Sequence, residues 1–164
     1  MAENQTELLS AASCAAIDAE LAKYPDDQRQ SAVMAALTIT QDANGGWLTR
    51  ELMDAVADYL GMPAIAVYEV ATFYSMYELK PVGRHKLCVC TNISCLLRGS
   101  EEVVAHLSER LGIGLGETTP DSRITLKEVE CLGACANAPM LQYGDRYVED
   151  LTPEKLDQLL EGLE

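Results

Sequence analysis

Five of the six cysteines lie in two short stretches, "CVCTNISC" at residues 88–95 and "CLGAC" at residues 131–135. Four residues separate Cys90 from Cys95, three separate Cys131 from Cys135, and 35 residues lie between the two pairs. Each pair follows a segment whose alternating pattern predicts a strand, so both loops can lie at the same edge of one sheet. Any fold of this chain must therefore account for four thiols that can converge from two loops.

Composition and charge exclude several classes of protein. The 164 residues include 12 basic and 26 acidic side chains, and a net charge of −14 repels nucleic-acid phosphates and anionic membranes. No apolar run approaches the roughly 20 residues that span a bilayer, and the start "MAENQTELLS" lacks the features of a secretory signal. We expect a soluble, cytoplasmic protein. In that compartment, paired cysteines bind metals or carry redox chemistry more often than they form disulfides.

The first half of the chain has the pattern of helices. About four are expected, near residues 7–23, 26–46, 49–61 and 63–79. The third is the clearest, because Thr49 suits its N-cap, Gly61 its end, and apolar residues recur at intervals of four between them. Pro63 fits the first turn of the fourth. Short turns between such helices indicate a small bundle.

The pattern changes at "KPVG", residues 80–83. A strand is expected over residues 84–90, a helix over 99–112 with Ser100 as its cap, and a second strand over 123–130. A hairpin turning at Gly144 and Asp145 follows, and a last helix over 151–163 has Thr152 as cap and Pro153 in its first turn. The prediction is an α+β chain, with a helical region at 1–82 and a compact α/β domain at 83–164.

Four thiolates can hold a zinc ion or a two-iron cluster. Structural zinc sites usually use a tight Cys-x2-Cys turn, whereas both pairs here are wider, which favours a 2Fe-2S cluster. The flanking residues also favour it, since Thr91, Asn92, Ser94 and the amides of residues 132–134 offer hydrogen-bond donors near the sulfurs. A zinc-stabilised interaction module is the main alternative, and disulfides are a third.

The remaining candidate residues have simpler interpretations. Cys88 lies two residues before Cys90 and is expected to be a buried free thiol, with ligand exchange as a minor alternative. Cys14 lies among alanines in a helix and is expected to be a small core residue. His85 and His106 are interpreted as structural or surface groups, because four better ligands are present.

Several longer motifs carry a resemblance to a known family. They are "VCTNISCLLRGS", "ECLGACANAPM", "YGDRYVEDLTPEKL" and "EVATFYSMYELKPVGRH". The chain resembles the thioredoxin-like 2Fe-2S subunits of respiratory complex I, the E-type subunits of NADH:quinone oxidoreductase. The likeness covers nearly the whole chain and is weakest over the first 25 or so residues.

The resemblance implies that Cys90, Cys95, Cys131 and Cys135 hold one 2Fe-2S cluster and that residues 83–164 form a thioredoxin-like domain. It also implies an electron-carrying subunit, without a catalytic residue or NADH site of its own. Its partner would be the flavoprotein subunit that binds NADH and FMN, in the peripheral arm on the cytoplasmic side of a bacterial inner membrane. Related hosts are NAD-linked hydrogenases and formate dehydrogenases, and a free-standing ferredoxin is a further alternative.

Overall fold

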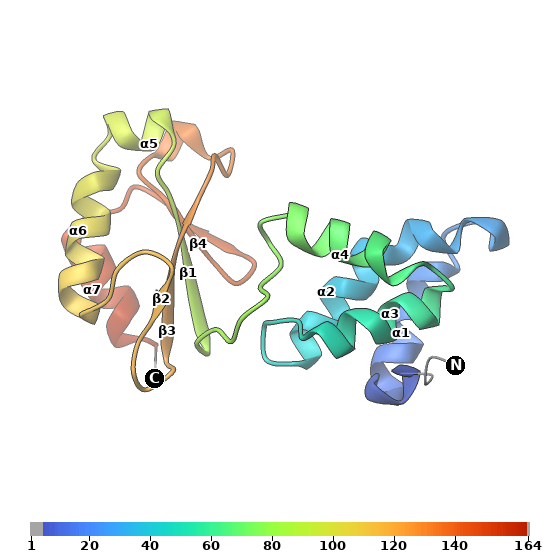
Figure 1. Ribbon diagram of the computed structural model, residues 1–164. Helices are drawn as coiled ribbons and strands as arrows, with labels where there is room; N and C mark the ends of the chain where they lie inside the picture. The colour runs from blue at the N-terminus through green and yellow to red at the C-terminus, as the bar shows by residue number, and fades with distance from the viewer. Residues whose placement is uncertain (1–4, 164) are drawn as a thin grey trace. The chain divides into compact units, whose positions relative to one another are not determined.

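The computed structural model describes residues 5–163, and the chain divides between Pro81 and Val82 into two compact units. The first unit is helical, and the second combines a five-stranded sheet with helices (Figure 1). The predicted α+β class is confirmed. None of the helices within residues 5–163 is long and apolar enough to cross a membrane.

The helical unit contains more, shorter helices than the sequence pattern predicts. They are the 3₁₀ segments η1 (Gln5–Leu8) and η2 (Asp26–Ala32) and the α-helices α1 (Ala11–Leu21), α2 (Val33–Ala43), α3 (Arg50–Leu60) and α4 (Ala64–Phe73). The ends of α3 are as predicted, because the Thr49 hydroxyl accepts the Leu52 N–H at 3.1 Å and Gly61 adopts a left-handed φ of 69°.

The fourth helix ends at Phe73, six residues before the predicted end at residue 79. The reason is tertiary. The side chain of Gln41, which is buried, donates to the Met76 carbonyl at 3.3 Å and accepts the Glu78 N–H at 2.8 Å. The Glu78 carbonyl in turn accepts the Leu48 N–H at 2.7 Å. These bonds hold the segment after Phe73 in a non-helical conformation.

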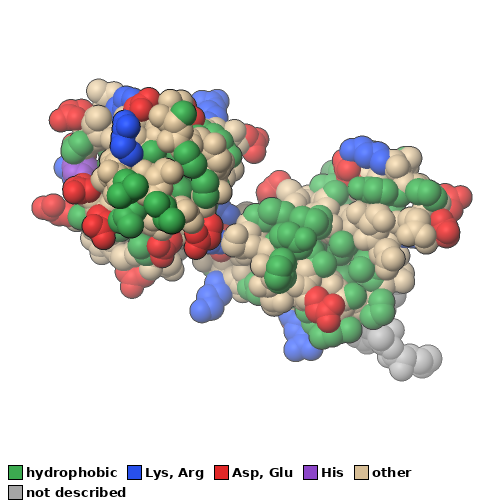
Figure 2. All heavy atoms as spheres, turned by 90° about the horizontal axis from the view of Figure 1, so that it is seen from above, with side chains coloured by type: hydrophobic (Ala, Val, Ile, Leu, Met, Phe, Trp, Pro, Cys, Tyr) green, Lys and Arg blue, Asp and Glu red, His purple; other side chains and the backbone are tan. Residues whose placement is uncertain are grey.

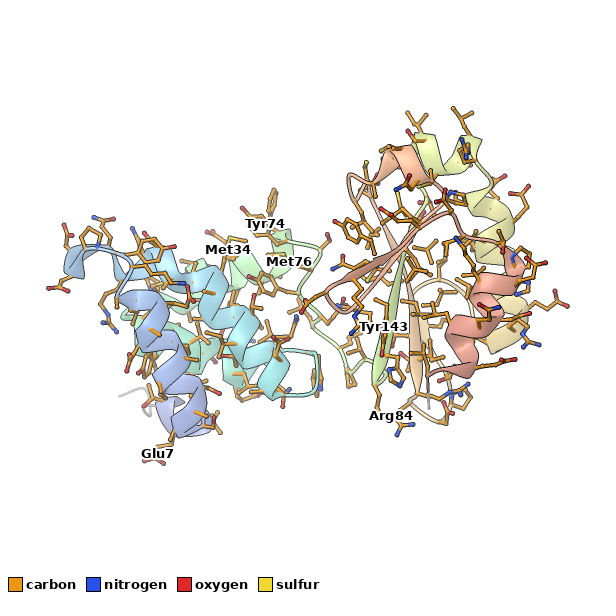
Figure 3. The ribbon with its side chains drawn as sticks, turned by 180° about the vertical axis from the view of Figure 1, so that it is seen from behind. Glu7, Met34, Tyr74, Met76, Arg84 and Tyr143 are labelled. Carbon is orange, nitrogen blue, oxygen red and sulfur yellow. The ribbon has the colours of Figure 1, made fainter. Side chains whose placement is uncertain are left out.

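The aromatic run at the end of this unit is divided between core and surface. Tyr77 is buried and donates to the Met34 carbonyl at 2.9 Å. Phe73 and Tyr74 are exposed, and Figure 3 shows the Tyr74 side chain projecting from the ribbon. The core itself is built from fully buried aliphatic side chains, which include Ile17, Leu37, Leu48, Val56 and Val67.

The second unit is built on a sheet with strand order β2-β3-β1-β4-β5. Its strands are β1 (His85–Cys90), β2 (Glu117–Thr118), β3 (Ile124–Val129), β4 (Leu141–Tyr143) and β5 (Arg146–Val148). Its helices are α5 (Ile93–Leu97), α6 (Ser100–Leu111) and α7 (Pro153–Glu161), with a short 3₁₀ turn, η3, at Cys135–Asn137. Among the strands of residues 5–163, only β1 and β3 pair in parallel, and the chain between them crosses over through α6.

The helices α6 and α7 cover one side of the sheet (Figure 1). Alternate strand residues point toward them, and Leu87, Leu126, Leu107 and Leu156 are fully buried between the layers. The predicted hairpin and the Thr152 cap of α7 are present, with the Lys155 N–H donating to the Thr152 hydroxyl at 3.3 Å. The cap predicted for α6 is wrong by one residue, because Gly99 occupies the N-cap and Ser100 is the first helical residue.

Gly83 lies where the chain enters β1, close to the start of β3. Its N–H donates to the Thr125 hydroxyl at 2.6 Å, and a Cβ added to it would meet backbone atoms of Arg123 and Ile124 at 2.9 Å. Backbone atoms cannot move aside as a side chain can. Glycine is therefore required for this close approach.

We expect Gly83→Ala to lower the free energy of unfolding by about 1–3 kcal/mol, as overpacking does in a dense core. Gly162→Ala is the matched control, because its Cβ would lie at an ordinary 3.5 Å from the Leu159 carbonyl oxygen. Denaturant unfolding followed by circular dichroism measures both. Equal stability of the two variants would contradict the steric interpretation of Gly83.

Candidate metal centre

The two cysteine loops leave the sheet from neighbouring strands. β1 and β3 run in parallel with Cys90 opposite Val129, so the segments that follow the two strands emerge at the same edge of the sheet. Cys90 is the last residue of β1, and Cys131 follows the end of β3 by two residues. The pairing of these strands therefore brings together the two stretches that the sequence separates by 35 residues.

The first loop contains α5, a five-residue helix that the sequence pattern does not predict. Asn92 starts it, because its side-chain oxygen accepts the Ile93 N–H at 2.8 Å. The helix turns Cys95 inward, where the side chain is 1% exposed, beside Cys90 at 2%. These two cysteines pack with Ala138 and Met140 in a small buried cluster. The first pair is thus enclosed by protein.

The second loop is more open. Cys131 and Cys135 are both exposed, and their sulfur atoms lie 3.3 Å apart. Gly133 lies between them with a left-handed φ of 88°, which brings its N–H toward the Cys131 sulfur. The Tyr147 hydroxyl donates to the Leu132 carbonyl at 2.8 Å and ties this loop to β5. The second pair therefore faces solvent on a fixed loop.

The four sulfurs form one interacting group. Burial raises the pKa of Cys95 to about 11, and the Cys90 and Cys135 thiols add to this rise. The Gly133 N–H lowers the pKa of Cys131, with a further lowering by Cys135. The Cys131 thiol raises the pKa of Cys135, and the Ser94 hydroxyl opposes that rise. Cys135 therefore lies near enough to both Cys131 and Cys95 to connect the two cysteine pairs electrostatically.

The other candidate residues have different surroundings. Cys88 is buried in β1, and Cys14 is half-buried in α1 of the helical unit, with its sulfur 4.0 Å from the Leu9 carbonyl oxygen. His85 shares a 2.8 Å hydrogen bond with Tyr143, and His106 lies 2.9 Å from Asp157. Within residues 5–163, no three His, Cys, Asp or Glu side chains are grouped closely enough to hold a single metal ion.

Two predicted donors have partners other than sulfur. The Thr91 hydroxyl donates to Glu128 at 2.6 Å, and the Asn92 amide donates to Glu130 at 2.5 Å. Sequence reasoning missed these two glutamates. The available signal was the alternation "KEVE" at residues 127–130, which places acidic side chains at the strand end that leads into the second cysteine pair.

The thiol environments predict a reactivity order in the reduced, metal-free protein. At pH 7.5 we expect iodoacetamide to modify Cys131 well before Cys95. Cys131 is exposed and has a lowered pKa, so more of it is thiolate, whereas Cys95 is buried with a pKa of about 11. Peptide mass spectrometry over a time course measures the order. Equal labelling rates would contradict the described environments.

Comparisons with known proteins agree on one family. Residues 17–164 match the family model described as Thioredoxin-like [2Fe-2S] ferredoxin. The E-type subunit of NADH-quinone oxidoreductase from Rickettsia bellii is 48% identical over 141 residues, which cover 86% of this chain and 84% of that protein. The mitochondrial NADH dehydrogenase [ubiquinone] flavoprotein 2 of Dictyostelium discoideum is 47% identical over 143 residues, covering 87% of this chain and 58% of that protein.

A solved structure shows the same fold. An NAD+-reducing [NiFe]-hydrogenase in the air-oxidized state aligns with a TM-score of 0.70 over 85% of this chain and 24% of that chain, at 20% sequence identity. The family match covers most of the chain, and the curated relatives are nearly half identical to it along most of its length. The resemblance seen in the motifs is thereby confirmed, and the chain belongs to the thioredoxin-like [2Fe-2S] ferredoxin family.

Proposed function

We propose that Cys90, Cys95, Cys131 and Cys135 hold one 2Fe-2S cluster and that the chain is an electron-transfer subunit of an NADH:quinone oxidoreductase. The observation that carries this proposal is that the parallel pairing of β1 with β3 brings both cysteine pairs to one sheet edge, where Cys135 of the second pair influences Cys95 of the first. Family membership supports the cluster, and the names of the curated relatives support the host enzyme.

The chemistry of the residues fits this group. A 2Fe-2S cluster takes four thiolates and supplies reversible one-electron transfer when bound. The Gly133 N–H lowers the pKa of Cys131, and the Ser94 hydroxyl opposes the rise that Cys131 causes in the pKa of Cys135. Both donors therefore favour the thiolate forms that ligate iron. The same donors stabilise negative charge at the sulfurs when an electron is added. Substrate chemistry is assigned to another subunit, and this chain contributes no catalytic residue to the proposal.

The domain roles follow from this assignment. Residues 83–164 are proposed to be the ferredoxin domain, and residues 1–82 are proposed to be a region that docks onto the rest of the complex. The helical unit exposes Phe73, Tyr74 and Met76, which are apolar groups suited to such contacts. We assign the assembled protein to the peripheral arm on the cytoplasmic side of a bacterial inner membrane.

The proposed partner is the flavoprotein subunit that binds FMN and NADH. Ile93, Leu96 and Leu97 on α5 are 70%, 45% and 80% exposed, and they border the loop that carries the cluster ligands. Figure 2 shows hydrophobic side chains gathered on this face of the second unit. An electron donor must approach the cysteines closely. The apolar surface beside them is more favourable in contact with a protein partner than in contact with water, so it suits a docking site.

The ligand assignment predicts distinct spectra for matched variants. Protein purified without oxygen should carry about two irons and two acid-labile sulfides per chain, and its reduced form should give an EPR signal. Cys131→Ser should shift that signal or abolish the cluster. Cys14→Ser and Cys88→Ser should leave it unchanged. Zinc without sulfide would overturn the cluster assignment, and an unchanged Cys131→Ser spectrum would overturn the ligand set.

The partner assignment predicts that an acidic residue on α5 disrupts pairing. Co-expressed with the flavoprotein subunit, Leu97→Glu should weaken association by about tenfold or more, because it places a charge in a desolvated contact. Leu115→Glu is the control, since Leu115 is a partly exposed leucine outside α5. Affinity capture of the pair measures both. If the two variants pair equally well, α5 is not the contact.

A further inference from the structure

Side chains continue the pairing of β1 and β3 beyond the end of the strands. The last backbone hydrogen bond runs from the Thr91 N–H to the Val129 carbonyl at 3.4 Å. Beside it, the Thr91 hydroxyl donates to the Glu128 carboxylate at 2.6 Å, and beyond it the Asn92 amide donates to the Glu130 carboxylate at 2.5 Å. Both bonds join the first cysteine loop to the strand end that leads into the second.

Asn92 has two roles at this point. Its side-chain oxygen starts α5 by accepting the Ile93 N–H, while its side-chain nitrogen holds Glu130. The helix that Asn92 starts contains Cys95, and Glu130 immediately precedes Cys131. One planar amide therefore links the position of a cysteine of the first pair to that of a cysteine of the second.

The strength of the contact depends on charge. A hydrogen bond to an ionised carboxylate is shorter and about twice as strong as one between neutral groups. Glu128 and Glu130 are exposed, so neither must be buried to form the bond. Without the amide donor, the Glu130 carboxylate would lie beside Cys131 with no fixed orientation, and its charge would oppose the addition of an electron nearby.

We propose that Asn92 and Glu130, with Thr91 and Glu128 beside them, form an inter-loop clamp that fixes the separation of the two cysteine pairs, and thereby controls cluster retention and reduction potential. This inference rests on the proposed cluster. The four side chains are positioning residues, because they act through the loops and contribute no ligand.

The test exchanges donor and acceptor across the clamp. Asn92→Asp keeps a side-chain oxygen to start α5 but sets a carboxylate against Glu130. We expect it to lose its cluster to a chelator on the order of ten times faster than the unaltered protein, as for other residues that support metal ligands. Adding Glu130→Gln supplies a new amide donor that faces the introduced carboxylate. The double variant should return to within about twofold of the original rate.

Glu130→Gln alone separates charge from geometry. The new side chain keeps an oxygen that accepts the Asn92 N–H, but it removes a negative charge beside Cys131. We expect a higher midpoint potential in a spectroscopic redox titration. Cluster loss should be faster than in the unaltered protein but slower than in Asn92→Asp, because a weaker, neutral hydrogen bond is kept. Glu109→Gln is the control, because it makes the same charge change on an exposed residue of α6 and should alter neither quantity.

Thermal unfolding of the cluster-free proteins tests whether a variant loses its cluster only because its fold is less stable. Equal melting temperatures together with unequal rates of cluster loss support the clamp. If Asn92→Asp does not fold, Glu130→Ala breaks the same bond from its exposed side and should also lose the cluster faster. The clamp is overturned if Asn92→Asp or Glu130→Ala keeps its cluster as long as the original, or if the double variant stays as labile as Asn92→Asp. A parent protein that purifies without iron and sulfide overturns the proposed function instead.

Discussion

The parallel pairing of β1 with β3 is the interaction on which the site depends. Parallel strands leave a sheet at the same edge, so the chain ends of both strands, and the cysteines that follow them, meet there. The pairing is anchored by Leu87 opposite Leu126, both fully buried against α6 and α7. A shift of one residue in this register would turn these leucines outward and displace one cysteine loop against the other. Core packing thus fixes the geometry of the proposed cluster site.

Features governed by local rules could be predicted from the sequence. Thr49 and Gly61 bound their helix as expected, the hairpin turns at Gly144 and Asp145, and Thr152 caps the last helix, because capping and turn chemistry act over a few neighbouring residues. The wide spacing within each cysteine pair favoured a 2Fe-2S cluster, and the longer motifs carried the resemblance to the family that the comparisons confirm.

Very short elements, and features governed by distant contacts, could not be predicted from the sequence. α5 has five residues, fewer than a helical period needs to show, and β2 has two. The early end of α4 depends on Gln41, whose bonds reach 35 and 37 residues along the chain. The contacts of Thr91 and Asn92 with Glu128 and Glu130 span 37 and 38 residues. Only the pairing of β1 with β3 brings the partners of Thr91 and Asn92 together, and only the packing of the helical unit brings Gln41 to its partners.

The two cysteine pairs differ in exposure, so the site has one buried side and one side that is open to solvent. Cys90 and Cys95 are enclosed by Ala138 and Met140, while Cys131 and Cys135 face outward on a loop held by Tyr147. The first pair is shielded from water and the second is accessible to a partner. Under the proposed function, electron exchange through the exposed pair is therefore compatible with stable attachment of the cluster to the buried pair.

The hydrophobic frame of the second unit contains none of the proposed ligands. Its main core is formed by strand and helix side chains such as Val89, Leu107 and Leu160, whereas Cys90 and Cys95 belong to a separate small cluster. Small zinc domains, in contrast, depend on their metal for folding. Here the frame and the side-chain bonds between the loops can define the separation of the cysteine pairs before any iron binds. A site whose cysteine loops are held in this way before the cluster binds needs little reorganisation when it is filled.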